Sequence, residues 1–470
     1  MSDCCRQGYD LAVVGAGSAG FSAAITAAEQ GANVALIGHG TIGGTCVNVG
    51  CVPSKTMIRA AEALHGAGSA ARFPGLTGEA HINDWRSLIQ AKDDLVASLR
   101  QKKYVDLLPE YNGIVYREGR ASFNGAGLLV DGEPIRADKI IVATGTSPAI
   151  PPIPGIEQIP YLTSTSALEL TELPLSLLVI GGGYIGCELA QMFARAGTRV
   201  TLVTRSRLLP EAEPEISEAL TSYFRAEGID VRTGLSYRSI ARIERGVRLS
   251  IDVEGESEDL HAQHVLVTTG RVPNTAGMGL AEAGIELTPD GAVTVDDRMR
   301  TSKTGVYAAG DVTGQDQFVY MAAYGARIAA SNALNGDSLA YDNSAMPWVV
   351  FTDPQLAGVG LTEAEARARG FAVKTSIAPL DQLPRALAAR DTRGLIKLVA
   401  DQETDLLLGG QILAPEGADS IQTLVMALKH GMTAKELGDT IFPYLTTVEG
   451  LKLAAQGFTK DVAKLSCCAG

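Results

Sequence analysis

At 470 residues the chain is too long for a single hydrophobic core, and about two to four domains are expected. It contains 46% hydrophobic and 20% charged residues, as globular proteins do, and it has no run of about eighteen apolar residues that would predict a membrane-spanning helix. The formal net charge of −13 argues against nucleic acid or an anionic membrane as its main partner.

The first predicted elements form a strand–helix–strand unit over residues 9–37. YDLAVVGAGSAG is predicted to be a strand and a glycine-rich turn, FSAAITAAEQG a helix, and ANVALIG a second strand. Gly15, Gly17 and Gly20 have the spacing in which the first glycine makes a tight turn, the second admits a pyrophosphate and the third allows close helix packing. The unit therefore predicts a dinucleotide site, although one such motif alone is weak evidence.

Seven cysteines form three close pairs and one single residue, at positions 4, 5, 46, 51, 187, 467 and 468. The N-terminal segment has no cleavable apolar leader, so a cytoplasmic location is expected, where cysteine pairs tend to be catalytic or metal-binding. Cys46 and Cys51 lie in GGTCVNVGCVPSK. Residues five apart in a regular helix are about 8–9 Å apart, too far for a disulfide, so a bridge requires a distorted turn at residues 48–50. A nearby helix N-terminus would favour a thiolate, whereas two buried, inert cysteines are the alternative.

Residues 176–205 repeat the strand–helix–strand pattern in SLLVIGGGYIG, CELAQMFARAG and TRVTLVTR. Gly181, Gly183 and Gly186 have the same spacing as the first glycine motif. Because both motifs follow a strand and open a helix, the sequence predicts two dinucleotide sites. Between them, PAIPPIPGIEQIP at 148–160 is rich in proline and is predicted to be a linker.

The second strand of each unit ends without the acidic residue that usually binds a ribose. In the second unit this end is VTRSR, where Arg205 and Arg207 flank the expected position. Arginine suits a 2′-phosphate, so we expect NADP(H) there, with two ordinary surface arginines as the alternative. In the first unit Gly38 stands at the position of the acid, and the sequence does not indicate what replaces it.

The pattern changes after residue 340. AMPWVVFTDPQLAGVG, GLIKLVA and LLLGGQILA are predicted to be antiparallel strands, and SIQTLVMALKHG and the last segment helices. The predicted fold class is α/β, with two Rossmann-like dinucleotide-binding domains and a C-terminal α+β domain. The expected domains are residues 1–150 with a return at 271–344, residues 151–270, and residues 345–470.

GGTCVNVGCVPSK resembles the active-site segment of the FAD-dependent pyridine nucleotide–disulfide oxidoreductases. The similarity runs nearly end to end, through ATG at 143–145, TTGRVPN, and YAAGD at 307–311. The resemblance implies FAD at the first unit, NADPH at the second, and electron transfer to a Cys46–Cys51 disulfide. Cys51 would face the flavin as the charge-transfer thiolate, and Cys46 would be the exchange thiol. The C-terminal domain would be the dimerisation domain.

The same resemblance implies roles for other residues. Lys55 resembles the lysine near flavin N5, with Glu188 as its expected ion-pair partner, and Asp311 resembles the aspartate that binds the ribityl chain. Tyr184 resembles the tyrosine that covers the nicotinamide pocket, with simple packing as the alternative. The flavin contacts would also include the motif residues Gly44, Thr45, Thr144 and Gly145.

Family members that act on disulfides carry a C-terminal His-Glu pair, whose histidine shuttles the thiol proton. Here FPYLTTVE places Tyr444 at the histidine position, followed by Glu449. Tyrosine titrates at a pH of about 10 and is a poor base at neutral pH. This difference argues against efficient reduction of lipoamide or glutathione.

Cys467 and Cys468 lie side by side near the chain end, in KLSCCAG. Such thiols are suited to capture a soft metal ion by ligand exchange, and a chain end can swing to pass the ion to Cys46 and Cys51. The ending resembles that of mercury-reducing members of the family. It implies Hg(II) thiolate complexes as the substrate, metal binding by all four cysteines, and a homodimer in which each tail serves the partner subunit's active site. Tyrosines 184 and 444 would line the inner metal site.

Two other functions stay open at the level of sequence. One is a disulfide reductase that uses the C-terminal thiols as a second redox relay, which leaves Tyr444 unexplained. The other is a non-catalytic thiol protein that sequesters soft metals, against which the two nucleotide motifs argue. Cys187 is interpreted as a packing residue, and Cys4 and Cys5 either assist metal capture or are an incidental pair.

Overall fold

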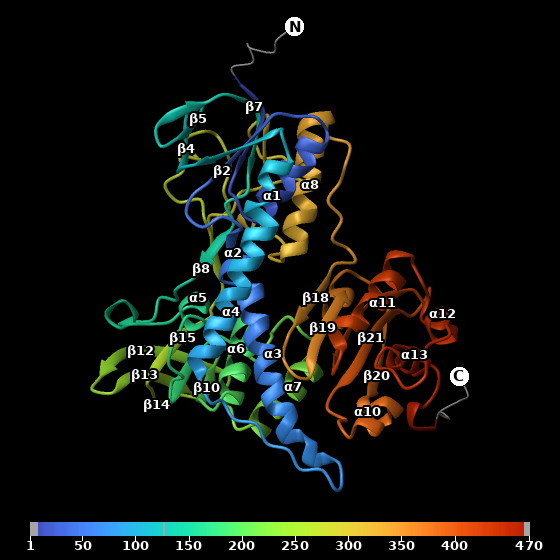
Figure 1. Cartoon of the computed structure of the whole chain (residues 1–470). Helices are drawn as coiled ribbons and strands as arrows, with labels where there is room; N and C mark the ends of the chain where they lie inside the picture. The colour runs from blue at the N-terminus through green and yellow to red at the C-terminus, as the bar shows by residue number, and fades with distance from the viewer. Residues whose placement is uncertain (1–7, 126, 465–470) are drawn as a thin grey trace. The chain divides into compact units, whose positions relative to one another are not determined.

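The computed structural model describes residues 8–125 and 127–464, which form two compact units (Figure 1). Unit 1 comprises Met1–Thr56, Arg86–Ala149 and Gly270–Asp342, and unit 2 comprises Met57–Trp85, Ile150–Thr269 and Asn343–Gly470. The α/β class expected from the sequence is confirmed, whereas the three domain boundaries stay a prediction. Within the described ranges no helix has both the length and the apolar character needed to span a bilayer.

Unit 1 is built on a five-stranded parallel sheet with the order β17-β7-β1-β2-β3. Its strands are β1 (Tyr9–Val14), β2 (Val34–Gly38), β3 (Ile114–Glu118), β7 (Ala137–Val142) and β17 (Val306–Ala308). Alternate residues of β1 enter different cores: Leu11 and Val13 belong to one cluster, and Ala12 and Val14 to another. The sheet is therefore buried on both faces, which explains its near-continuous apolar strands.

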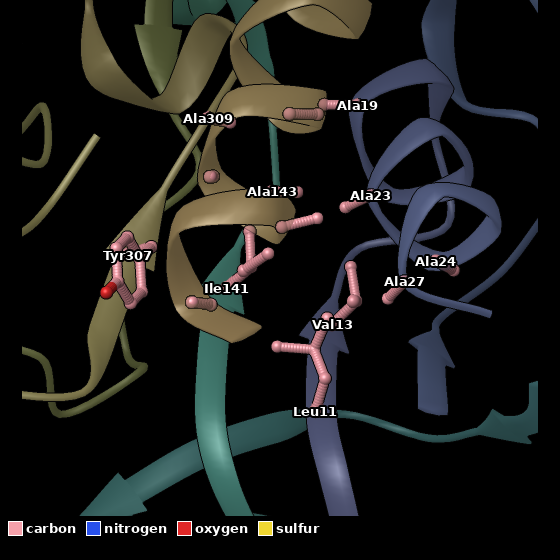
Figure 2. Packing of buried hydrophobic residues seen from close by; sticks show 14 of the residues in the cluster. Leu11, Val13, Ala19, Ala23, Ala24, Ala27, Ile141, Ala143, Tyr307 and Ala309 are labelled. Carbon is pink, nitrogen blue, oxygen red and sulfur yellow. The ribbon is translucent and has the colours of Figure 1, made fainter. Parts of the chain in front are cut away.

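Helices α1 (Ser18–Glu29) and α8 (Val319–Asn335) pack together over the first of these cores. Figure 2 shows Ala23 and Ala27 of α1 on the side of the helix that faces Val13 and Ile141 of the sheet; Leu11 and Tyr307 belong to the same cluster. Apart from Phe21, the buried residues on this helix are small, including Ala23, Ala24 and Ala27. Small side chains bring the helix close to the sheet, which places its N-terminus at the carboxyl end of β1.

Further elements of unit 1 surround this sheet. The helices are α2 (Gly44–Asn48), the start of α3 (Cys51–Gly68), α4 (Trp85–Arg100), a π-helical turn (Gln101–Val105), and short turns at Leu108–Glu110 and Asp311–Thr313. An antiparallel sheet contains β4 (Ala121–Asn124), β5 (Gly127–Val130) and β6 (Glu133–Ile135), and β8 (Thr146–Pro148) pairs with β16 (Arg271–Pro273). The β8–β16 pair joins two distant segments of the sequence beside the end of the main sheet.

Unit 2 contains a second parallel sheet with the order β11-β10-β9-β15. Its strands are β9 (Ser176–Ile180), β10 (Arg199–Val203), β11 (Asp230–Arg232) and β15 (His264–Val267). An antiparallel sheet of β12 (Leu235–Ile243), β13 (Gly246–Val253) and β14 (Glu256–Ala262) shares a core with it. The helices of this part are α5 (Ser164–Ala167), α6 (Tyr184–Arg195) and α7 (Pro214–Ala226).

The C-terminal part of unit 2 is an antiparallel sheet with the order β18-β19-β22-β21-β20. Its strands are β18 (Pro347–Val350), β19 (Gln355–Gly360), β20 (Val373–Pro379), β21 (Leu395–Asp401) and β22 (Leu407–Ala414). The helices are α9 (Glu363–Ala368), α10 (Pro384–Ala389), α11 (Gly417–Lys429), α12 (Ala434–Asp439) and α13 (Glu449–Gln456), with short turns at Ser69–Arg72, Ile156–Gln158, Leu380–Gln382 and Val462–Lys464 elsewhere in the unit. The antiparallel strands predicted after residue 340 are confirmed.

A buried ion cluster ties the two parts of unit 2 together. The Nζ atom of Lys397 on β21 lies 3.0 Å from carboxylate oxygens of Glu213, Glu215 and Glu363. Lys397 is 1% exposed, so the cluster replaces its lost hydration with three charged partners. This arrangement fixes α7, beside the parallel sheet of unit 2, against the C-terminal sheet.

The Pro-rich segment 148–160 differs from its sequence prediction. It crosses from unit 1 to unit 2, as a linker would, but Ile153, Ile156 and Ile159 are each no more than 6% exposed and belong to the core beside the parallel sheet of unit 2. The prolines suggested a free linker, whereas the isoleucines at every third position anchor the segment. Burial of these side chains makes the segment part of unit 2.

Candidate functional site

The first glycine loop of unit 1 has no space for side chains. A Cβ added at Gly15, whose φ is +121°, would lie 2.1 Å from Ala143 O. A Cβ at Gly20 would lie 1.7 Å from Gly15 O, so the helix packs directly on the turn. Gly17 precedes the first residue of α1 and leaves the helix N-terminus open. The three glycines thus form the tight turn that their spacing predicts, and the binding of a pyrophosphate there stays a prediction.

The GGT segment before the cysteines packs against this loop. Gly43 N donates a hydrogen bond to Ala16 O at 2.9 Å, and a Cβ added at Gly44 would lie 2.6 Å from Gly17 Cα. Asn48 Nδ2 donates to Ile42 O at 2.9 Å and to Gly44 O at 2.8 Å. This contact joins the glycine loop to the segment that carries Thr45 and the cysteine pair.

Thr144 and Asp311 lie in the same part of unit 1, at the ends of β7 and β17. Thr144 Oγ1 is buried and has no hydrogen-bond partner among the described residues. Asp311 Oδ2 accepts a hydrogen bond from Thr146 Oγ1 at 2.9 Å. Gly145, between the two threonines, has a φ of +69° and so allows the chain to turn there. An unpaired buried hydroxyl costs free energy, which indicates a partner that the chain itself does not supply.

Arg271 of β16 is a site residue that sequence reasoning missed. Its Nε donates to Thr146 Oγ1 at 2.7 Å, and its Nη2 donates to Thr146 O at 2.7 Å. Burial lowers the pKa of Arg271, while the charges of Asp311 and Cys51 raise it, so this guanidinium lies near both groups. Arg271 lies in the TTGRVPN motif, which contributed to the family resemblance but did not by itself indicate a role for the arginine.

Cys46 and Cys51 are brought together by a break between two helices. α2 ends at Asn48 and α3 begins at Cys51, so the distorted turn expected at residues 48–50 is present. Gly50 is needed for close approach rather than for a positive φ, because an added Cβ would lie 3.0 Å from Thr45 O. Both cysteines carry free thiols and are partly buried.

The thiols of Cys46 and Cys51 are joined by a hydrogen bond. The hydrogen bond to Cys51 raises the pKa of Cys46, and burial raises it further. Cys51 is the first residue of α3, where the helix dipole favours an anion, and Arg271 adds a positive charge. These causes favour the protonated form of Cys46, and the thiolate expected at Cys51 stays a prediction.

Tyr104 is a second residue that sequence reasoning missed. Burial is the main cause of its raised pKa, and the charges of Cys46 and Cys51 add to it. Its ring packs edge-to-face on Phe21, with centroids 4.9 Å apart. No motif pointed to Tyr104, because it reaches the cysteines from the π-helical turn after α4.

The glycine loop of unit 2 repeats the geometry of the first. A Cβ added at Gly181, with a φ of +114°, would lie 2.5 Å from Thr268 O, and one at Gly186 would lie 1.9 Å from Gly181 O. Gly183 precedes the first residue of α6, and nothing lies within 4 Å of its added Cβ. A dinucleotide pyrophosphate fits both loops on this evidence.

The two arginines after β10 differ in their contacts. Arg207 Nη2 donates to Pro210 O and to Ala212 O, both at 2.7 Å, and so holds the following loop. Arg205 is exposed, and its charge lowers the pKa of Tyr237, although burial raises that pKa overall to about 12. Arg205 is therefore better placed than Arg207 to bind a phosphate.

Other predicted site residues lie in unit 2. Tyr184, at the start of α6, packs edge-to-face on Trp348 with centroids 5.8 Å apart, and its hydroxyl donates to Glu211 Oε2 at 3.4 Å. Glu188 is 5% exposed, and its Oε1 accepts from Phe351 N at 2.9 Å. Because Lys55 belongs to unit 1, the Lys55–Glu188 pair stays a prediction.

The sequence was compared with family models and with known proteins. The model of the pyridine nucleotide-disulphide oxidoreductases matches residues 9–330, and the model of their dimerisation domain matches residues 346–455. The chain belongs to the pyridine nucleotide-disulphide oxidoreductase family.

Relatives of this oxidoreductase include mercuric reductases. The chain is 46% identical to the mercuric reductase of Streptomyces lividans over 99% of both chains. It is 47% identical to that of Staphylococcus aureus over 98% of this chain and 84% of the relative. Among solved structures, the Cu(II) complex of the HOCl-induced flavoprotein disulfide reductase RclA from Escherichia coli is similar, with a TM-score of 0.84 and 32% identity over 96% of this chain and 99% of that one.

Family membership supports a flavin and a pyridine nucleotide as cofactors, and the dimerisation domain indicates a homodimer. Tyr444 is 51% exposed and lies within the matched dimerisation domain, and its equivalence to the histidine of disulfide-reducing members stays a prediction. Across the described ranges no three His, Cys, Asp or Glu side chains form a metal-binding group. Cysteines 4, 5, 467 and 468 lie outside the described residues.

Proposed function

We propose that this oxidoreductase reduces Hg(II), delivered as a dithiolate complex, to elemental mercury with NADPH as the electron donor. The 46% identity to a mercuric reductase over 99% of both chains carries the proposal. The overall reaction converts one Hg(II) dithiolate, one NADPH and one proton into Hg(0), two thiols and NADP⁺. The use of NADPH and of free thiols suits a reducing compartment, so a cytoplasmic location is part of the proposal.

FAD would be held by unit 1. The loop of Gly15, Gly17 and Gly20 would receive the pyrophosphate, and Asp311 would accept hydrogen bonds from the ribityl chain. Thr144 Oγ1, which is buried and without a partner among the described residues, supports a ligand at this position. The remaining contacts would come from Gly44, Thr45, Lys55 and Gly145. The corresponding domain would be residues 1–150 with 271–344.

NADPH would be held in residues 151–270. Gly181, Gly183 and Gly186 would receive its pyrophosphate at the N-terminus of α6. Arg205 would bind the 2′-phosphate through charge-assisted hydrogen bonds. Arg207 would support this site by holding the loop, since its guanidinium already donates to two carbonyl groups.

The two bound cofactors supply hydride transfer from the nicotinamide to the flavin and deliver an electron pair to the cysteine site. Cys46 would exchange ligands with the incoming Hg(II): its Sγ binds the metal as one substrate Hg–S bond breaks, and its proton, which its raised pKa retains until then, passes to the departing substrate thiolate. Each new Hg–S bond releases one substrate thiol. Cys51, beside Arg271 and at the start of α3, would be the thiolate that faces the flavin.

Three side chains would organise this centre. Lys55 lies one helical turn after Cys51 and would hold a positive charge near flavin N5, paired with Glu188. Tyr184 would cover the nicotinamide pocket, since it starts the helix that follows the second glycine loop. The role of Lys55 needs a positive charge, and the role of Tyr184 needs an aromatic ring. A single substitution removes either property.

Cys467 and Cys468 would capture Hg(II) and pass it to Cys46 and Cys51 of the partner subunit's active site. Thiolates are the preferred ligands of a soft metal ion, and exchange between dithiol pairs conserves the number of Hg–S bonds. Tyr444 would line the inner site in place of a proton-shuttling histidine. The C-terminal residues 345–470 would form the interface of the homodimer.

The proposal is tested by NADPH oxidation with Hg(II) in excess small thiol, with mercury vapour collected from the headspace. We expect Hg(II)-dependent turnover that falls by at least about a thousandfold in Cys46→Ser. The variant Cys467→Ala/Cys468→Ala should lose activity chiefly when competing thiol is in excess. Ser466→Ala is the matched tail control and should retain full activity.

A disulfide reductase is the second candidate, favoured by the similarity to RclA. The same assay with oxidised glutathione and lipoamide distinguishes the two functions. Turnover of a disulfide without mercury vapour, abolished by the tail double variant, would sink the mercury proposal. A Tyr444→His variant that gains disulfide reduction would support the role assigned to this position.

A further inference from the structure

A tyrosine from the neighbouring strand closes the end of β2. A Cβ added at Gly38 would lie 2.7 Å from Tyr116 Oη, 2.9 Å from Tyr116 Cε2 and 2.7 Å from Ala16 Cβ. Heavy atoms in packed proteins do not approach so closely, so an acidic side chain at position 38 would displace its neighbours. The position that carries the ribose-binding acid in other dinucleotide sites is thus occupied by the Tyr116 hydroxyl.

The parallel ladder brings an acidic residue to the same point. Gly38 pairs in register with Glu118 of β3, and Gly119 N donates to Gly38 O at 2.8 Å. Tyr116 and Glu118 are two residues apart on one strand, so their side chains leave the same face of the sheet. Neighbouring strands are about 4.8 Å apart, so Glu118 lies one strand spacing from the position that carries the acid in other dinucleotide sites.

Burial and charge agree with this placement. Tyr116 is partly buried and packs against the core that contains Leu36, whereas Glu118 is exposed at the strand end. Burial raises the pKa of Tyr116, and the charge of Glu118 raises it further, so the carboxylate lies close to the hydroxyl. Both groups therefore flank the space next to Ala16 in the first glycine loop.

We propose that Glu118 and Tyr116 Oη bind the hydroxyl groups of the adenosine ribose of FAD in place of the missing β2 acid; this inference rests on the proposed flavin site. The ligand of a parallel sheet lies at the carboxyl ends of the strands, where both residues are found. The Glu118 carboxylate accepts hydrogen bonds from the ribose hydroxyls, and the Tyr116 hydroxyl completes the contact. A carboxylate here also repels a 2′-phosphate, so this site discriminates against phosphorylated ribose.

The test measures flavin binding, not mercury turnover. The full chain is stripped of flavin and titrated with three probes: FAD, an FAD analogue without the adenosine 2′ and 3′ hydroxyls, and FMN. The variants are Glu118→Gln and Tyr116→Phe, which keep side-chain size. Arg117→Gln is the matched control, because Arg117 lies on the same strand and points to the opposite face.

We expect Glu118→Gln to weaken FAD binding about tenfold and Tyr116→Phe to weaken it a fewfold, with little effect on the dideoxy analogue or FMN. Equal weakening of all three probes would indicate a structural role and overturn the inference. So would unchanged FAD affinity in Glu118→Gln, or a loss as large in Arg117→Gln. A wild type that binds FAD but does not reduce mercury would refute the proposed function and leave this inference standing.

Discussion

The two glycine loops have the same backbone hydrogen bond to the neighbouring strand, and they place side chains differently at one pair of positions. Gly15 N donates to Ile37 O at 2.8 Å, and Gly181 N donates to Val203 O at 2.9 Å, so Gly38 and Thr204 are structural equivalents. The neighbouring loop residues are Ala16 and Gly182. In unit 1 the loop residue, Ala16, has a Cβ and the strand ends in Gly38. In unit 2 the loop residue is Gly182 and the strand ends in Thr204, which has a Cβ.

This reversal follows from a shortage of space. An added Cβ at Gly38 would lie 2.7 Å from Ala16 Cβ, and one at Gly182 would lie 3.1 Å from Thr204 Cβ. In each unit, therefore, a Cβ fits without a close contact at either the loop position or the strand-end position, but not at both. The comparison teaches that the residue at a strand end depends on its neighbour in the loop as well as on the ligand.

The charged groups beside the two strand ends have opposite signs. Tyr116 lies near Glu118, which raises the pKa of its phenol, and Tyr237 lies near Arg205, which lowers the pKa of its phenol. A carboxylate suits ribose hydroxyls, and a guanidinium suits a 2′-phosphate. The two sites are therefore expected to reject each other's ligand.

The largest expected effect comes from substitutions in the two glycine loops, each of which should abolish the binding of a different cofactor. Gly20→Ala and Gly186→Ala each place a Cβ less than 2 Å from a carbonyl oxygen, at 1.7 Å and 1.9 Å, and should cost more than about 3 kcal/mol locally. Gly20→Ala should yield colourless protein, whereas Gly186→Ala should keep its flavin but lose reduction by NADPH. Absorbance spectra before and after NADPH addition measure both outcomes.

Gly66→Ala is the control for these variants, because nothing lies within 4 Å of its added Cβ. This helical position should tolerate alanine, with a change in stability of no more than about 1 kcal/mol. Retention of full flavin content in Gly20→Ala would contradict the role of the first loop.

The next effect concerns the choice of nucleotide. Arg205→Ser should lower kcat/KM for NADPH by about 10- to 100-fold and leave that for NADH nearly unchanged, because only the 2′-phosphate contact is lost. Arg207→Ser should affect both nucleotides alike, since this side chain holds the loop through Pro210 O and Ala212 O. Steady-state kinetics with both nucleotides measure the difference. An Arg207 effect confined to NADPH would reverse the assignment.

A smaller effect tests whether the loop position and the strand-end position compete for the same space. Gly182→Ala should cost about 1–2 kcal/mol, because the new Cβ meets Leu208 Cδ2 at 2.8 Å and Thr204 Cβ at 3.1 Å. Thr204 Cγ2 also lies 3.1 Å from the new Cβ, so combining the change with Thr204→Ala should relieve less of the strain than combining it with Thr204→Gly, which removes both close atoms. Urea unfolding of the wild type, the single variants and the two double variants measures these differences. Full additivity of Gly182→Ala and Thr204→Gly would show that the positions do not compete.

The smallest effect is a pair of opposite pKa changes. Glu118→Gln should lower the pKa of Tyr116, and Arg205→Ser should raise that of Tyr237, which burial already raises to about 12. Phenolate absorbance, corrected with the matching Tyr→Phe variants, measures both shifts. If the pKa values of Tyr116 and Tyr237 shifted in the same direction, the opposite charges assigned to the two strand ends would be contradicted.

The raised pKa of Tyr237 also predicts a pH dependence of stability. The folded state holds this proton more tightly than the unfolded state, whose tyrosine pKa is about 10. The stabilising contribution is therefore complete below pH 10 and is lost as the pH rises toward 12. Tyr237→Phe should flatten the free energy of unfolding over this alkaline range. An unchanged slope would show that Tyr237 titrates normally.

Local patterns in the sequence were enough to predict much of the fold. The spacing of Gly15, Gly17 and Gly20, and its repetition in unit 2, predicted the two strand–turn–helix units, because positive φ and close helix packing are local requirements of the chain. The distorted turn between Cys46 and Cys51 followed from helix geometry once a bridge between the two cysteines was assumed. The change to antiparallel strands after residue 340 followed from the apolar pattern.

The tertiary structure decided what surrounds these motifs. Residues 38 and 116 meet because β2 and β3 are neighbours in the sheet, and their separation in sequence gives no sign of it. In the same way, Arg271 reaches the cysteine site through the β8–β16 pair, and the isoleucines of the Pro-rich segment enter a core formed by distant strands. Motif spacing specifies the local backbone, whereas the identity of a contacting side chain depends on which strands and helices pack together.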